Sequence, residues 1–169
     1  MDQEPDQTED QDETRQYKHF PCVLMAVGTA ERGDDGLAIH SAKLLEELDT
    51  EDNWLIIPCG IYPENYTATA TRARPKTVVL LDAAEMGLEP GQVRIVGTLR
   101  LNTILLSTHR IPLSFLVDYL AKEVPEVVFI GVQPRSLEGV GLSPEVKAAA
   151  EDIAHSLSQQ SYREFKVIK

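Results

Sequence analysis

The chain has 169 residues, of which 43% are hydrophobic, and a formal net charge of −11. This length suits one domain, and the hydrophobic content excludes a chain that is disordered throughout. The acidic charge argues against a nucleic-acid partner, because phosphate backbones would be repelled.

The first 19 residues form an acidic segment. Between Met1 and Gln16 there are seven Asp and Glu residues, one basic residue, Arg15, and no large apolar residue after Met1. Such a segment cannot bury an apolar face, so residues 1–19 are predicted to be disordered and residues 20–169 to form a single domain.

The chain starts without the basic end and apolar run of a secretory signal, and no apolar stretch approaches the ~20 residues that span a bilayer. We therefore expect a cytoplasmic protein without membrane insertion.

Predicted strands and helices alternate along the domain. The apolar run at 22–27 is typical of a strand buried on both faces, and the apolar spacing over 37–48 predicts a helix. Further strands are predicted at 54–57, 77–81, 92–96 and 127–130, and further helices from Pro63, behind Pro112, and from Ser143–Pro144. This order predicts a three-layer α/β/α domain with a mostly parallel sheet, in which the half-exposed strand 92–96 is an antiparallel edge strand.

Two acidic motifs and one histidine motif fall where strands or loops turn toward helices. They are Gly33–Asp34–Asp35–Gly36, Leu81–Asp82–Ala83 and Ser107–Thr108–His109–Arg110. Ligands of such sheets bind beyond the carboxyl ends of the strands, and two carboxylates with an imidazole suit Ni²⁺ or Zn²⁺. The alternatives are structural: Asp34 or Asp35 could cap the following helix, and Asp82 could be a turn residue bonded to nearby amides.

Other chemistries have weaker signals. The sequence has no GxGxxG or P-loop for a nucleotide, no HExxH for a helix-borne zinc peptidase and no GxSxG for a serine nucleophile. Cys59 could face the same cleft, but a nucleophilic cysteine needs an adjacent base, and none is visible. We expect Cys22 and Cys59 to be reduced thiols in or near the core.

Longer motifs surround these residues in a fixed order. They are 27–36, Pro63–Glu64–Asn65, 81–83 with 86–91, 107–109 before 111–113, and 129–134 with 142–146. Over roughly 23–157, this set resembles the hydrogenase maturation endopeptidases, in particular the branch that processes the large subunit of hydrogenase 3-type nickel-iron hydrogenases.

The resemblance implies a twisted five-stranded sheet between helices and a nickel site formed by Asp35, Asp82 and His109. It implies that the enzyme removes a C-terminal extension from the large-subunit precursor after nickel insertion. The partner is then a nickel-loaded precursor, the nickel belongs to that substrate and is not permanently bound, and the protease is expected to be a monomer. The residues expected to support the site are Gly28, Asp34, Gly36, Asn65 and Thr108.

Two departures from the family pattern concern the site. Thr29 stands where the family usually has Asn, and an Asp that usually follows the second strand is absent near Pro58. The catalytic residue is therefore unassigned, and Glu64 is a candidate. Two other hypotheses stay open: a non-catalytic, nickel-dependent checkpoint that binds the precursor, and an autonomous zinc metallopeptidase.

Overall fold

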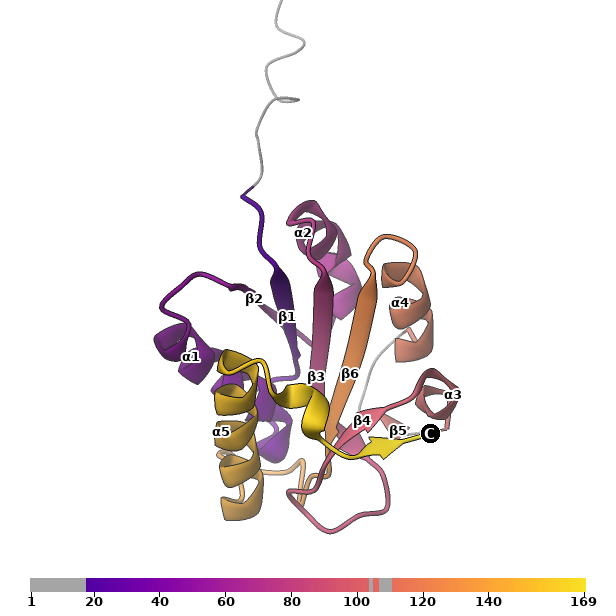
Figure 1. Ribbon diagram of the computed structural model, residues 1–169. Helices are drawn as coiled ribbons and strands as arrows, with labels where there is room; N and C mark the ends of the chain where they lie inside the picture. The colour runs from indigo at the N-terminus through magenta and orange to yellow at the C-terminus, as the bar shows by residue number, and fades with distance from the viewer. Residues whose placement is uncertain (1–17, 104, 107–110) are drawn as a thin grey trace, which may run out of the picture.

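The computed structural model describes residues 18–103, 105–106 and 111–169 (Figure 1). The acidic segment predicted at 1–19 lies almost wholly outside these residues, so its disorder stays a prediction. The strands are β1 (Cys22–Val27), β2 (Trp54–Gly60), β3 (Thr77–Glu85), β4 (Val93–Val96), β5 (Leu105–Leu106), β6 (Glu126–Val132) and β7 (Val167–Ile168). The helices are α1 (Leu37–Leu48), α2 (Thr67–Arg72), α3 (Thr98–Leu101), α4 (Leu113–Leu120) and α5 (Pro144–Ser158), with 3-10 turns η1 (Gly33–Gly36), η2 (Pro63–Tyr66) and η3 (Tyr162–Glu164).

The predicted sheet is confirmed, and it is larger than expected. Its order is β2-β1-β3-β6-β4-β7, with β5 paired to β3. The strands β2, β1, β3 and β6 are parallel, and β4 is antiparallel to β6, as predicted for 92–96. The described part of the chain has seven strands where five were expected. The two additional strands, β5 and β7, are each only two residues long, which is too short to give a pattern in the sequence. Strand β4 is not outermost, since β7 pairs with it.

Helices cover both faces of the sheet, which makes the three layers (Figure 1). Helices α1 and α5 pack together on one face, over a core that includes Leu24, and α2 and α4 lie on the other, over a core that includes Met25. Adjacent residues of β1 point to opposite faces, so a strand with both faces covered must be apolar throughout. No helix in the described part of the chain combines the length and apolarity needed to cross a membrane.

Strand β3 extends beyond its predicted end at residue 81. It runs to Glu85, so Asp82 lies within the strand rather than after it. The neighbouring strand β1 is shorter, and its last residue paired with β3 is Ala26, opposite Leu81. Asp82 therefore stands one position past the pairing with β1, at the carboxyl edge of that part of the sheet.

Candidate functional site

Asp35 is held at the carboxyl end of β1 by a close approach of two main-chain segments. It is buried in η1, and its Oδ2 accepts a hydrogen bond from the Thr29 amide at 3.0 Å. Gly28 has a φ of +119°, and a Cβ there would lie 2.1 Å from the Asp35 carbonyl oxygen. Only glycine allows η1 to lie so close to the strand end. Because Thr29 contacts the carboxylate through its main chain, this contact does not depend on whether residue 29 is Thr or Asn.

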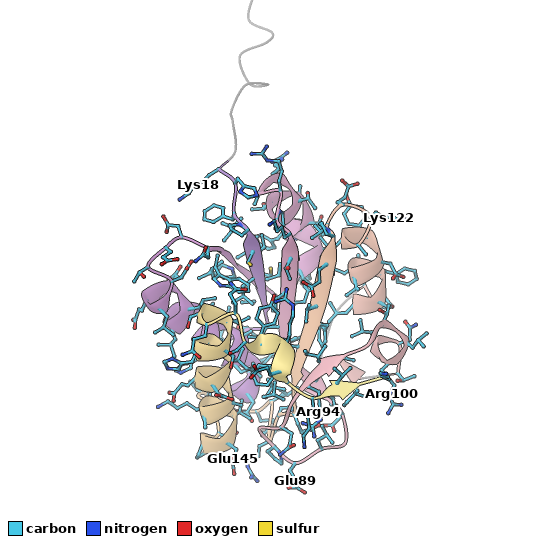
Figure 2. The ribbon with its side chains drawn as sticks, viewed as in Figure 1. Lys18, Glu89, Arg94, Arg100, Lys122 and Glu145 are labelled. Atoms are coloured by element: carbon cyan, nitrogen blue, oxygen red, sulfur yellow. The ribbon has the colours of Figure 1, made fainter. Side chains whose placement is uncertain are left out.

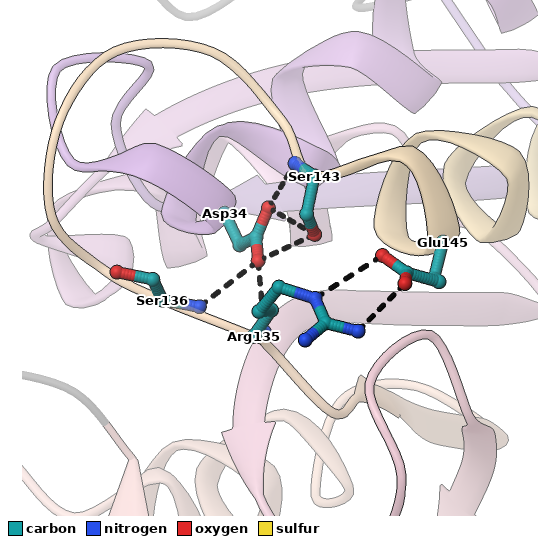
Figure 3. Close-up of polar contacts among 5 residues, drawn as sticks. All are labelled: Asp34, Arg135, Ser136, Ser143 and Glu145. Atoms are coloured by element: carbon teal, nitrogen blue, oxygen red, sulfur yellow. Dashed lines mark hydrogen bonds and ion pairs between the residues drawn. The ribbon is translucent and has the colours of Figure 1, made fainter.

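Asp34, although adjacent, points into a different network (Figure 3). Its Oδ1 accepts from the Ser143 amide at 2.7 Å, and its Oδ2 accepts from the Arg135 and Ser136 amides at 2.8 and 3.2 Å. The Ser143 hydroxyl donates to the same carboxylate at 2.9 Å. Burial alone would raise the pKa of Asp34, but the hydrogen bonds from Ser143, Arg135 and Ser136 outweigh it and lower the pKa. Asp34 thus anchors the segment 135–143 to η1.

The capping alternative for the two aspartates is wrong. The N-cap residue of α1 is Gly36, and no side chain caps this helix or η1. A Cβ on Gly36 would lie 2.9 Å from the Ala30 Cα, so this position is also closely packed. Ser143 is the N-cap residue of α5, where the sequence predicts that a helix begins, but its hydroxyl donates to Asp34 rather than capping the helix.

Asp82 is completely buried in β3, so the alternative of a turn aspartate is wrong. It lies opposite Gly131 of β6. Leu80 and Ala84, two residues away on either side, belong to the core beneath α2 and α4, and the alternation of a strand directs Asp82 to that face as well. The turn η1 contacts β3, so Asp35 and Asp82 come from neighbouring segments.

His109 and Thr108 lie outside the described residues, and all three predicted metal ligands stay predictions. The chain reaches this stretch next to β3, because Leu106 pairs with Ala84, two residues after Asp82. Within 18–103, 105–106 and 111–169, no three His, Cys, Asp or Glu side chains are grouped so that they could hold a metal ion. The described residues therefore supply two carboxylates, and a complete site of the predicted kind needs His109.

A pocket of about 380 Å³ is lined in part by Thr29, whose amide donates to Asp35. Asn65, one of the predicted supporting residues, lines it together with Glu31, whereas Glu64 is half-buried on η2 and is not among the lining residues. Cys59 also borders the pocket, but burial raises the pKa of its thiol to about 12. A thiol with so high a pKa is not an effective nucleophile, and Cys59 is a buried free cysteine, as expected. The lining residues are Thr29, Glu31, Cys59, Gly60, Ile61, Tyr62, Asn65 and Tyr66.

Gln133 is a buried residue to which sequence analysis assigned no role. Its Nε2 donates to both carboxylate oxygens of Glu85 at 3.0 Å, and its Oε1 accepts from the Met86 and Leu88 amides at 2.8 and 3.2 Å. It therefore ties the segment after β3 to the end of β6. The available signal was an amide side chain directly after an apolar strand, where an unpaired polar group would cost free energy.

Three comparisons with known proteins agree. The model of the hydrogenase maturation protease family matches residues 39–160, well over half of the chain. The hydrogenase 3 maturation protease of Escherichia coli K12 is 36% identical over 116 residues, which cover 66% of this chain and 72% of that protein. The solution structure of the endopeptidase HycI from Escherichia coli gives a TM-score of 0.80 at 29% identity, covering 89% of this chain and 97% of that one.

The crystal structure of a NiFe hydrogenase maturation protease HycI from Thermococcus kodakarensis KOD1 gives a TM-score of 0.74 at 31% identity. It covers 83% of this chain and 91% of that one. Fold and sequence thus lead to the same group of peptide-bond hydrolases. The chain belongs to the hydrogenase maturation protease family and is an endopeptidase of the HycI type.

Proposed function

We propose that this endopeptidase removes the C-terminal extension of a nickel-iron hydrogenase large-subunit precursor after nickel has been inserted. The nickel ion is part of the substrate, and Asp35, Asp82 and His109 recognise it. Membership of the family supports the class of substrate, and the Thermococcus relative bears the name of a NiFe hydrogenase maturation protease. A precursor without nickel offers no ion for these side chains and is left uncut.

The observation that carries this proposal is the burial of Asp35 and Asp82 in neighbouring segments at the carboxyl edge of the sheet. Burying a carboxylate costs free energy, and neither residue has the capping or turn role that would explain its position. Carboxylates together with an imidazole are suitable ligands for Ni²⁺. The pocket lined by Thr29 is a suitable place for the peptide near the scissile bond, because the Thr29 amide donates to Asp35.

The test compares precursor that carries nickel with precursor that lacks it, and intact mass reports loss of the C-terminal peptide. We expect cleavage of the loaded form alone. Asp35→Asn, Asp82→Asn and His109→Ala should each slow cleavage at least about 100-fold, because each removes a ligand of the recognised ion. Matched controls are Asp152→Asn and His155→Ala on the exposed side of α5, which should cleave at the normal rate.

Three outcomes would contradict the proposal, each in a different way. Equal cleavage of both precursors would exclude nickel as the recognition element. Binding of the loaded precursor without loss of mass would indicate a checkpoint module instead of a working protease. Stoichiometric zinc in the purified protein, with activity lost on its removal, would indicate a resident catalytic metal.

A further inference from the structure

Helix α4 carries a row of large apolar side chains on its outer side. Ile111, just before the helix, is 41% exposed, Phe115 is 66% exposed and Tyr119 is 54% exposed. Phe115 and Tyr119 are four residues apart within α4, so they lie along one side of the helix. Leu99 on α3, a helix in contact with α4, is also apolar and is 87% exposed. We call Ile111, Phe115, Tyr119 and Leu99 the α4 stripe.

The opposite side of α4 is apolar too. Leu113, Leu116, Val117 and Leu120 are buried against the sheet, and the only polar residues of the helix are Ser114 and Asp118. A helix that is apolar around most of its circumference is typical of one covered on both sides. Single exposed apolar residues are ordinary on protein surfaces, whereas a contiguous row of them marks an interaction surface.

The α4 stripe begins at the same edge of the sheet as the candidate site. Strand β5, which precedes this region, pairs with Ala84 near Asp82. Strand β6, which follows α4, starts beside the amino end of β3, where the Glu126 amide donates to the Lys76 carbonyl. Figure 2 shows Lys122, just past α4, at the opposite end of the molecule from Glu89, which follows β3. Helix α4 therefore leads away from the site over about 12 Å, since each of its 8 residues adds 1.5 Å.

We propose that the α4 stripe docks an apolar surface of the hydrogenase large-subunit precursor, and this inference rests on the proposed function. A protein substrate that reaches Asp35 and Asp82 also covers the surface around them, because specific interfaces bury about 800 Å² on each partner. The stripe is continuous with that surface and offers two aromatic residues, a type enriched among the residues that dominate binding energy. A second copy of this chain is a poorer occupant, since it would bring the same net charge of −11 to the interface.

The experiment measures KM and kcat on nickel-loaded precursor for the double variant Phe115→Ser/Tyr119→Ser. We expect KM to rise at least about tenfold with kcat within twofold, because the lost contacts bind the precursor but do not touch the scissile bond. The control is Val140→Ser, which removes an apolar side chain that is 91% exposed on the α1 and α5 side and should leave both constants unchanged. Thermal unfolding of both variants should match the wild type, since the replaced side chains are largely outside the core.

Each result bears on one proposal separately. An unchanged KM in the double variant overturns the docking inference and leaves the proposed function intact. Sedimentation could also show that the wild type is a dimer and the double variant a monomer. That result would assign the stripe to contact with a second copy and would overturn the docking inference. If both precursor forms are cleaved equally and the double variant still has a raised KM, the docking inference is supported and nickel recognition is overturned.

Discussion

Asp34 and Asp35 are neighbours in sequence with separate roles. Asp34 accepts hydrogen bonds from Arg135, Ser136 and Ser143, whereas Asp35 is held by the Thr29 amide beside the pocket. Sequence patterns show that an aspartate before a helix is a favoured cap, and they do not show partners about 100 positions away. For this reason the choice between the two residues came from the family resemblance and not from local rules.

Asp34→Asn should destabilise the fold by about 3 kcal/mol at pH 7, because a buried carboxylate that accepts several hydrogen bonds is lost. The pKa of Asp34 is lower in the folded state than in the unfolded state. Its contribution to the free energy of unfolding is therefore complete above the unfolded-state pKa of about 4 and is lost as the pH falls through the folded-state pKa. Urea unfolding of wild type and variant between pH 7 and 3 should therefore show a difference that shrinks below about pH 4. A difference of equal size at pH 7 and pH 3 would contradict this, and Asp152→Asn on the surface should change little at either pH.

At the scale of the elements, the longer strands and helices were predictable and the shortest were not. The apolar runs of β1 and β6 and the spacing in α1 and α5 are strong local signals. Strands β5 and β7 have two residues each, too few for any periodicity, and they exist because a neighbouring strand edge is available. Strand β3 passes through Asp82 because β6 continues beside it, up to the pairing of Ala83 with Val132.

Gln133→Glu tests how the segment after β3 is attached to β6. The substitution replaces an amide donor with a carboxylate that faces the carboxylate of Glu85, so repulsion should lower the free energy of unfolding by at least about 2 kcal/mol at pH 7. Thermal unfolding at pH 7 measures the loss. Adding Glu85→Gln to the variant removes the facing carboxylate and should restore stability. Failure of this second substitution to restore stability would show that repulsion is not the cause.

At the scale of the whole molecule, the alternation of elements predicted the layers, while the order of the strands came only from the structure. Placing β6 between β3 and β4 depends on long-range pairing, which periodicity does not encode. Packing near the start of the described residues involves Phe20, which contacts the core beneath α2 and whose amide donates to the Ala73 carbonyl at 3.1 Å. The predicted tail lies before this contact.

A chain that begins at Lys18 should therefore keep the stability of the full chain within about 0.5 kcal/mol and cleave precursor at the same rate. A chain that begins at Pro21 also loses Phe20 and should be less stable by about 1–2 kcal/mol. Urea unfolding of the three chains checks both expectations. A large loss already in the chain from Lys18 would show that the acidic segment belongs to the folded unit.

The bonds of Asp34 also divide the synthesis of the site into two stages. Its partners follow it by 101 to 109 positions, beyond β6. A nascent chain that has left the ribosome only as far as β4 has Asp35 and Asp82 but lacks the segment 135–143 that anchors η1. The residues that anchor η1 are thus synthesised after both carboxylates.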